Sequence, residues 1–326
     1  MARRARRLGA PGGTVSTIVI PWNSVHIPDG FLATPVWLTL DAAVLPAIVV
    51  LARRARRDLE EARAPLLGVM GAFVFAAQMI NFPVAAGTSA HLVGGALLAI
   101  AVGPAAACVV MTAILAVQAF VFQDGGILAL GANVLNMAIA GVLAGYLPYR
   151  LWGAGRHRKA AIFAAGAVSV MVSALLAVSE LLASRVPLRP AILAFLLVVF
   201  AMSALVEGVI TVAVVQGIER LSPRIIRHTA PQRSWAWALA GAGAVLLAAA
   251  GGLVASTNPD GLQWLGAQLD MLGRISNLLP APLADYRIGW LGTPWLAKAA
   301  AGVAGAVLVG LICIALGRSA ARTRSA

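Results

Sequence analysis

Residues 25–32 read Val-His-Ile-Pro-Asp-Gly-Phe-Leu, a short polar, turn-forming stretch that stands directly before a long series of apolar runs. His26 is one of only four histidines in 326 residues. A single histidine in a loop is most simply a residue without a ligand. We interpret His26 instead as a metal ligand, because the rest of the chain has the features of a membrane body that would hold such a site.

The composition predicts a membrane protein. The chain is 60% hydrophobic and 11% charged, whereas a soluble domain carries about 25% charged residues. The net charge is +13. The basic residues lie between apolar runs, with few aromatic residues among them, so we interpret them as a topology signal and not as a nucleic-acid interface. Cys108 and Cys313 lie inside apolar runs without a CxxC partner, and we expect buried thiols.

Nine apolar runs predict an all-α polytopic membrane protein with about nine transmembrane helices, since a span takes about 20 residues. The division between the third and the fourth run rests on Gly103-Pro104 and on the total length of the two runs. The runs cover residues 35–52, 65–81, 93–107, 108–122, 127–149, 160–183, 191–218, 235–254 and 295–316.

The basic residues predict the orientation. If the arginine cluster at residues 53–57 is cytoplasmic, the cytoplasmic segments hold sixteen Lys or Arg and the external segments after His26 hold four. Because cytoplasmic loops carry an excess of Lys and Arg, we expect His26 outside and the C-terminus inside. A segment of about residues 255–294 then forms an external loop before the last helix.

Three acidic residues, Asp41, Glu180 and Glu207, lie within the apolar runs. Carboxylates are costly in lipid and usually face protein or water. Their pattern fits a proton path, and it fits equally well a structural role in which each caps a neighbouring helix or pairs with an arginine.

The polar motifs are concentrated between residues 78 and 137. One of them contains His91, which the predicted topology puts at the outer end of a helix, on the same side of the membrane as His26. His157 and His228 fall instead in basic cytoplasmic loops. The motifs read Gln78-Met-Ile-Asn81-Phe-Pro-Val, Gly87-Thr-Ser-Ala-His91, Phe122-Gln-Asp-Gly-Gly126 and Gly131-Ala-Asn133-Val-Leu-Asn136.

Three of these motifs, at 78–84, 87–91 and 122–126, together with His-Ile-Pro-Asp-Gly-Phe-Leu at 26–32, resemble the CbiM/NikM proteins, the substrate-binding S components of energy-coupling factor transporters for cobalt and nickel. The tail resembles the PDGLE or CbiN/NikN-type component through Asn258-Pro-Asp-Gly-Leu262 and Pro282–Arg287, with Gln263 where that family usually has Glu. The resemblance implies a fused protein of seven plus two helices. Its metal-binding part would cover residues 25–230 and its two-helix part residues 231–326, with the external loop at 255–294.

A histidine at the second position of a chain offers three nitrogens to one metal: the amine, its own backbone amide and the imidazole Nδ1. One more imidazole completes a planar set that suits Ni²⁺ and that Co²⁺ accepts. The resemblance implies that His26 supplies two nitrogens, the amine of Val25 the third and His91 the fourth. Candidates for orienting the imidazoles, each of which also fits a packing or capping role, are Gln78, Asn81 and Ser89.

The chain has no Gly-x-x-x-x-Gly-Lys-Ser/Thr phosphate loop, so ATP hydrolysis would fall to another subunit. The resemblance implies a transmembrane coupling (T) subunit and ATPase subunits in the cell membrane, with Ni²⁺ or Co²⁺ as the transported substrate and no organic cofactor. A proton-coupled secondary transporter using Asp41, Glu180 and Glu207 is the main alternative. An intramembrane enzyme would need a set such as His-Glu-x-x-His, and none is evident.

Residues 1–24 are expected to be an extension from a misassigned start. They put four arginines outside, against the rule that the other segments obey, and they lack the apolar core of a signal peptide. Valine is the internal translation of GUG, which gives Met as a start codon, and 23 Arg against 2 Lys indicate a GC-rich genome. We therefore expect a chain that starts at Val25 with His26 second; proteolysis at the same point would expose the same amine.

Overall fold

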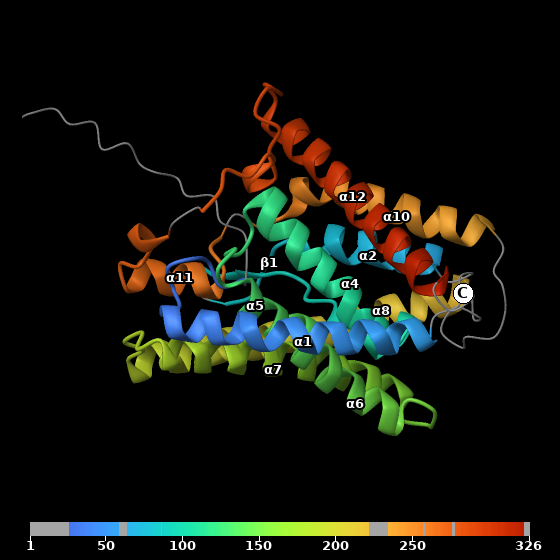
Figure 1. Cartoon of the computed structure of the whole chain (residues 1–326), viewed down its shortest axis with the longest axis horizontal. Helices are drawn as coiled ribbons and strands as arrows, with labels where there is room; N and C mark the ends of the chain where they lie inside the picture. Colours follow the sequence, from blue (N-terminus) through green and yellow to red (C-terminus); the bar gives the residue numbers. More distant parts are fainter. Residues whose placement is uncertain are drawn as a thin grey trace, which may run out of the picture.

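The computed structural model describes residues 26–58, 64–85, 87–221, 234–256, 258–275 and 278–322. They form a bundle of apolar helices with one small two-stranded sheet (Figure 1). The helices are α1 Thr34–Asp58, α2 Ala64–Gln78, α3 Gly95–Val102, α4 Pro104–Val117, α5 Leu130–Asn133, α6 Val142–Trp152, α7 Arg158–Ala183, α8 Pro190–Leu221, α10 Ser234–Val254, α11 Gly261–Gln268 and α12 Pro294–Arg322.

Two of these helices continue as π-helix. Residues Gln118–Phe122 extend α4, and Val134–Gly141 join α5 to α6. The strands β1 (Phe82–Pro83) and β2 (Ser89–Ala90) pair antiparallel. Because π-helical turns often mark functional sites, their position in the motif-rich part of the chain indicates a functional site there.

Within the described ranges, six helical stretches are long and apolar enough to cross a membrane, so the prediction of an all-α multi-pass protein is confirmed at that level. Each of the nine predicted runs coincides with helical chain, but nine membrane spans are not confirmed. Helix α2 and the apolar part of α10 are shorter, and α3 has only eight residues. The six stretches are Thr34–Arg57, Pro104–Phe122, Leu130–Trp152, Arg158–Ala183, Pro190–Arg220 and Pro294–Ala320.

The predicted boundary between the third and fourth runs, at residues 107–108, is wrong. The break falls at Gly103, whose φ of 87° is left-handed, and Pro104 is the first residue of α4. Proline fits the first turn of a helix because its missing N–H has no intrahelical acceptor there. Gly103-Pro104 thus ends α3 before the predicted boundary.

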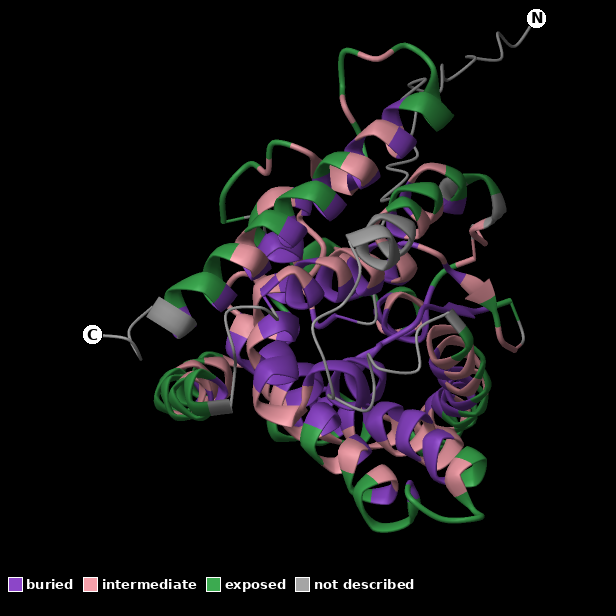
Figure 2. Cartoon of the chain, turned by 90° about the vertical axis from the view of Figure 1, so that its right-hand side faces the viewer, coloured by how far each residue is buried: buried purple, intermediate pink, exposed green. Residues whose placement is uncertain are grey.

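The outer surfaces of the bundle are apolar. Leu45, Leu246 and Leu311 are 70%, 68% and 60% exposed, as expected of side chains that face lipid and not water. Figure 2 shows the buried residues gathered at the centre of the bundle and the exposed ones on outward helix faces. Helix α1 is the least covered span, with 11% of its apolar window buried.

The C-terminal helices α10 and α12 pack beside α2 (Figure 1). The contact depends on small residues: a Cβ built on Gly68 would lie 2.4 Å from Ile314, and one on Gly305 would lie 2.4 Å from Phe75. Small residues let helix backbones approach closely in lipid. The tail is therefore a packed part of the bundle.

Between α2 and α3 the chain runs through the bundle without forming a helix. Residues 91–94 are buried and not helical. Gly94 has φ 76°, and a Cβ there would lie 2.6 Å from Val74, so both the conformation and the packing favour glycine. Non-helical backbone inside a membrane protein is tolerated where protein surrounds it and satisfies its polar groups. This segment carries one of the candidate ligands.

Candidate metal centre

The structure brings His26 and His91 together, although 65 positions separate them in the chain. Their ring centroids are 5.5 Å apart and the rings are tilted by 40°. Both residues are buried, at 2% and 3% exposed. Two imidazoles that share one metal, with nitrogen about 2 Å from the ion, hold their ring centres roughly 4.5–6.5 Å apart. The spacing therefore suits a shared ion.

His26 is positioned by α5 and by the loop before it. The side-chain amide of Asn133 binds both backbone polar groups of Ile27, the residue after His26. The Ile27 N–H donates to Asn133 Oδ1 at 2.8 Å, and Asn133 Nδ2 donates to the Ile27 carbonyl at 3.0 Å. The Gly126 N–H donates to the same carbonyl at 2.9 Å. A Cβ on Gly125 would lie 3.0 Å from that of His26, so the paired glycines allow this close approach.

Asp29 fixes the turn that follows His26. Its carboxylate accepts backbone N–H groups from Ile127, Leu128 and Ala129 at 3.0, 2.8 and 3.1 Å. Burial raises the pKa of Asp29, and these three hydrogen bonds oppose the rise by favouring the charged form. The Pro-Asp-Gly turn is thereby joined to the segment that precedes α5.

His91 lies in the extended segment after β2, not at the end of a helix as predicted, because the chain leaves α2 at Gln78 and becomes helical again only at Gly95. Its Nδ1 donates to the Leu92 carbonyl at 2.8 Å. A carbonyl can only accept, so the neutral ring carries its proton on Nδ1 and its lone pair on Nε2. Burial, together with the nearby His26, lowers the pKa of His91 to about 4, which keeps the ring in the neutral form that binds metals.

Two side chains hold the backbone just after His91. Glu207 on α8 is buried and accepts the N–H groups of Val93 and Gly94, each at 2.8 Å. Gln78 donates to the Val93 carbonyl at 2.7 Å. Glu207, which the sequence offered for a proton path, therefore has a structural role in positioning this segment.

The other two acidic residues of the apolar runs are also hydrogen-bonded. Asp41 accepts the Gly131 N–H at 2.7 Å, in the first turn of α5. Glu180 accepts from Asn136 Nδ2 at 2.8 Å. The capping role offered as an alternative for Asp41 describes its contact in the structure.

The remaining residues expected to orient the imidazoles tie the His91 segment to the C-terminal loop. Ser89 donates through Oγ to the Asn258 carbonyl at 2.7 Å and through its N–H to the Pro259 carbonyl at 2.8 Å. Asn81 is buried, and its carbonyl accepts the Ser256 N–H at 2.7 Å. Both motifs therefore dock the loop beside the histidines.

The Pro-Asp-Gly-Leu-Gln stretch of that loop begins α11 with a capping box. Asp260 accepts the N–H groups of Leu262 and Gln263, and Gln263 Oε1 accepts the Asp260 N–H at 3.1 Å. Glu and Gln both serve at this position of a capping box. Gln263 therefore fills the cap that a Glu would fill.

The loop also covers His26 with apolar side chains. Leu262, Leu265 and Met271 join Ile27 and Phe31 in one buried cluster. A Cβ on Gly30 would lie 2.2 Å from the Arg274 carbonyl, which shows how closely the loop lies on the Pro-Asp-Gly turn. The site is enclosed by residues from both ends of the chain.

A second contact from the C-terminal part reaches the site through Asp124. His26 Nδ1 lies 3.2 Å from Asp124 Oδ1, and the Tyr286 hydroxyl donates to Asp124 Oδ2. Tyr286 is 4% exposed and stacks on Phe122 with centroids 4.6 Å apart. Sequence reasoning recognised the motif that holds Asp124 but assigned no role to Asp124, Asn133 or Tyr286.

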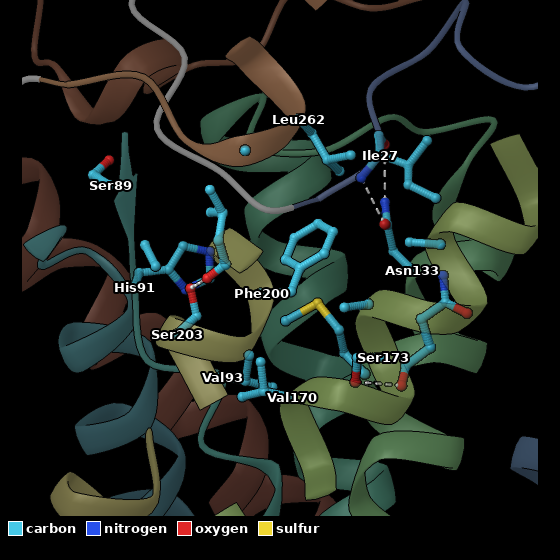
Figure 3. A pocket seen from close by; sticks show the side chains of 17 residues that line it. Ile27, Ser89, His91, Val93, Asn133, Val170, Ser173, Phe200, Ser203 and Leu262 are labelled. Atoms are coloured by element: carbon cyan, nitrogen blue, oxygen red, sulfur yellow. Dashed lines mark hydrogen bonds between the residues drawn. The ribbon is translucent and has the colours of Figure 1, made fainter. Parts of the chain in front are cut away.

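A small cavity of about 30 Å³ adjoins His91 (Figure 3). Asn133, Ser173, Phe200 and Ser203 line it from α5, α7 and α8. A space of this size accommodates about two water molecules when polar groups line it. Apolar side chains make up most of the lining, with the polar groups of Asn133, Ser173 and Ser203 among them.

The other predicted positions are elsewhere. His157 is exposed before α7 and accepts a hydrogen bond from Arg156. Val25, residues 1–24 and His228 lie outside the described residues. Among the residues that the structure describes, no group of three or more His, Cys, Asp and Glu is placed to hold a metal ion, so the two imidazoles would need donors of another kind.

The fold and this site define a class: a multi-pass membrane protein with a buried pair of histidines enclosed by its own C-terminal loop. The chain belongs to the CbiM family, described as the cobalt uptake substrate-specific transmembrane region, whose model matches residues 26–225. The PDGLE domain matches residues 234–322. The resemblance inferred from the motifs is thus confirmed. The family to which the chain belongs transports nickel and cobalt.

Two relatives share the fused arrangement. The chain is 37% identical over 91% of its length to a putative fused nickel transport protein NikMN of Archaeoglobus fulgidus, of which it covers 99%. It is 36% identical over 64% of its length to a probable fused nickel transport protein LarMN of Lactiplantibacillus plantarum, covering 69% of that protein. A crystal structure of a transition metal transporter matches 62% of this chain and 96% of its own with 31% identity and a TM-score of 0.55.

Proposed function

We propose that this chain is the substrate-specific membrane subunit of an ATP-driven energy-coupling factor importer, and that it binds Ni²⁺ or Co²⁺ at the external side. The observation that supports the proposal most directly is the pair of buried imidazoles 5.5 Å apart. The fused nickel transport proteins among its relatives support the choice of metal.

The proposed ligands are His26 and His91. A chain that begins at residue 25 would add the amine of Val25 and the His26 amide, and would use Nδ1 of His26 in the planar set that suits Ni²⁺. Nδ1 cannot bind the metal while it contacts Asp124, since it offers one lone pair. That donor set therefore requires both a free amine and a different partner for Asp124.

The orientation is proposed from the distribution of charge over the fold. Helix α11 lies at one end of the helices, and the C-terminal ends of α1 and α12 lie at the other (Figure 1). Leu262 and Leu265 of α11 share a buried cluster with Ile27, the residue after His26. The second end carries exposed arginines, which cytoplasmic segments favour. They are Arg53, Arg54, Arg56, Arg57, Arg150, Arg156 and Arg318.

The remaining parts of the proposal concern partners. A coupling (T) subunit and ATPase subunits would supply the energy and move the loaded chain within the membrane. The metal-binding part would extend over residues 25–230 and the two-helix part over 231–326. The enclosing contacts of the loop at 255–294 support a role in loading the site.

The decisive experiment is uptake of radioactive Ni²⁺ into proteoliposomes. Uptake is expected when the chain is reconstituted with its coupling and ATPase subunits and ATP, and not with the chain alone. Uptake by the chain alone that follows a pH gradient, and that is lost in Glu180→Gln, would instead establish the proton-coupled secondary transporter. The structural hydrogen bonds of Asp41, Glu180 and Glu207 favour the first outcome.

A further inference from the structure

A cavity between four helices has no part in the function proposed so far. Its walls come from α1, α2, α4 and α12, near the end of the bundle where α1 and α12 finish (Figure 1). Its volume is about 320 Å³, against about 30 Å³ for the cavity beside His91. Pockets that bind small molecules typically measure about 300–1,000 Å³, so the volume suits a ligand.

The lining of this cavity is mostly apolar. Leu67 of α2, Val110 of α4 and Leu316 of α12 contribute to its walls. Ala52 and Ala55 face it from α1, and their small side chains leave the space between α1 and the neighbouring helices unfilled. Because water finds few hydrogen-bond partners against such walls, hydrocarbon is the favoured content.

The cavity lies at the ends of three candidate membrane spans. The spans Thr34–Arg57 and Pro294–Ala320 end beside it, and Pro104–Phe122 begins beside it. The ends of a span lie near the boundary between the acyl chains and the headgroups of the bilayer. Since the cavity is also partly open, an acyl chain can enter it from the neighbouring leaflet.

Among the lining residues that the structure describes, one is charged: Arg56, whose side chain is exposed. Arg56 has no carboxylate partner among the described residues. Exposed arginines surround it on α1 and α12, namely Arg53, Arg54, Arg57 and Arg318. A guanidinium binds phosphate in a bidentate manner, and basic pockets between transmembrane helices on the cytoplasmic side bind the headgroups of anionic lipids. The cavity therefore matches an acyl chain with a phosphate at its mouth.

The cavity also lies between the two parts of the chain. Helices α1, α2 and α4 fall in the CbiM region (residues 26–225), and α12 falls in the PDGLE domain (residues 234–322). Beside the cavity the two parts touch closely, since a Cβ on Gly71 would lie 2.9 Å from the sulfur of Cys313, which lines the cavity. A ligand there contacts both parts and fills a gap in their interface.

We propose that this cavity binds an acyl chain of an anionic phospholipid, that the phosphate of the lipid pairs with Arg56, and that the bound lipid joins the CbiM region to the PDGLE domain. The site is separate from His26 and His91 and does not depend on their function. Its place in the cytoplasmic leaflet follows from the proposed orientation.

The test is a titration of the full purified chain, delipidated in detergent, with phosphatidylglycerol or with phosphatidylcholine of the same acyl chains. Native mass spectrometry measures the bound lipid, and thermal unfolding measures its effect on stability. Phosphatidylglycerol should bind more tightly and raise the melting temperature more, because a ligand of the folded state stabilises it.

Two arginine variants test the headgroup contact. Arg56→Gln should weaken the binding of phosphatidylglycerol about fivefold, which corresponds to about 1 kcal/mol for one basic residue near an anionic lipid. Arg150→Gln is the matched control, because Arg150 is exposed near the end of α6 and does not line the cavity. It should leave binding unchanged.

Ala106→Leu tests the acyl-chain contact. Ala106 is 4% exposed and lines the cavity from the first turn of α4. Leucine there should weaken the binding of phosphatidylglycerol, while the delipidated variant should melt no lower than the wild type because the added carbons occupy empty volume. Where Ala106→Leu fails to fold, the two arginine variants decide alone.

Three results would overturn the inference: equal binding of the two lipids, equal effects of Arg56→Gln and Arg150→Gln, or wild-type lipid binding in a folded Ala106→Leu chain. A chain that takes up no lipid would also overturn it and would leave the cavity to a segment of a partner protein. None of these results bears on metal binding by His26 and His91.

Discussion

The capping box of α11 allows a quantitative test of how the C-terminal loop is held over His26. In Asp260→Ala the N–H groups of Leu262 and Gln263 lose the carboxylate that accepts them at 2.7 and 2.8 Å. Loss of an N-cap typically costs about 0.5–2 kcal/mol. Because about 1.4 kcal/mol corresponds to a tenfold change, the undocked population of α11 should rise roughly 2- to 30-fold.

Hydrogen–deuterium exchange measures that population directly, since amides exchange through local opening. Peptides that cover residues 261–268 should exchange about 2- to 30-fold faster in Asp260→Ala, and peptides from α7 should not change. Gln263→Glu keeps the capping box and is the matched control, with wild-type exchange expected. Unchanged exchange in Asp260→Ala, or an equal increase in α7, would refute the claim that this cap holds the loop in place.

Three further predictions concern the surroundings of His26. Gly126→Ala would put a Cβ 2.2 Å from Asp29 Oδ1, so we expect a loss of about 1–3 kcal/mol and a lower melting temperature. Gly155→Ala, where the Cβ meets nothing within 4 Å, should melt as the wild type does, and equal melting of both variants would contradict the close contact. Asn133→Ala leaves the buried Ile27 N–H without its acceptor and should destabilise the protein by about 1–3 kcal/mol in thermal unfolding; Ser179→Ala, at an exposed hydroxyl that donates to Leu175, is its control, and an equal effect of the two would count against the role of Asn133. A chain that begins at residue 25 should bind Ni²⁺ more tightly than the full chain in calorimetry, and acetylation of its amine should abolish the gain; a gain that survives acetylation would exclude the amine as a ligand.

Several features of the fold could be predicted because they depend on composition and local signals. The apolar runs identified the helices, since only a membrane makes such runs favourable. Gly103-Pro104 indicated a helix break, because glycine permits the left-handed φ and proline begins a helix. The length of α3 could not be predicted, since its eight residues are stabilised by complete burial within the bundle and not by any local signal.

The candidate site was predictable where chemistry restricts the residue type. The predicted topology put His26 and His91 on the same side, the family resemblance paired them as ligands, and the structure puts their rings side by side. Asp124, Asn133 and Tyr286 could not be found in this way, because their roles depend on contacts across 98, 106 and 162 positions of the chain. A carboxylate or amide in a loop has no local feature that reveals such a distant partner.

The central claim is that His26 and His91 together hold the transported metal. The measurement that tests it most directly is the calorimetric affinity of the purified chain for Ni²⁺ and Co²⁺ after His26→Ala and after His91→Ala, with the exposed His157→Ala as the control. We expect each of the first two variants to abolish high-affinity binding and the third to leave it unchanged. Wild-type affinity in His91→Ala would contradict the account.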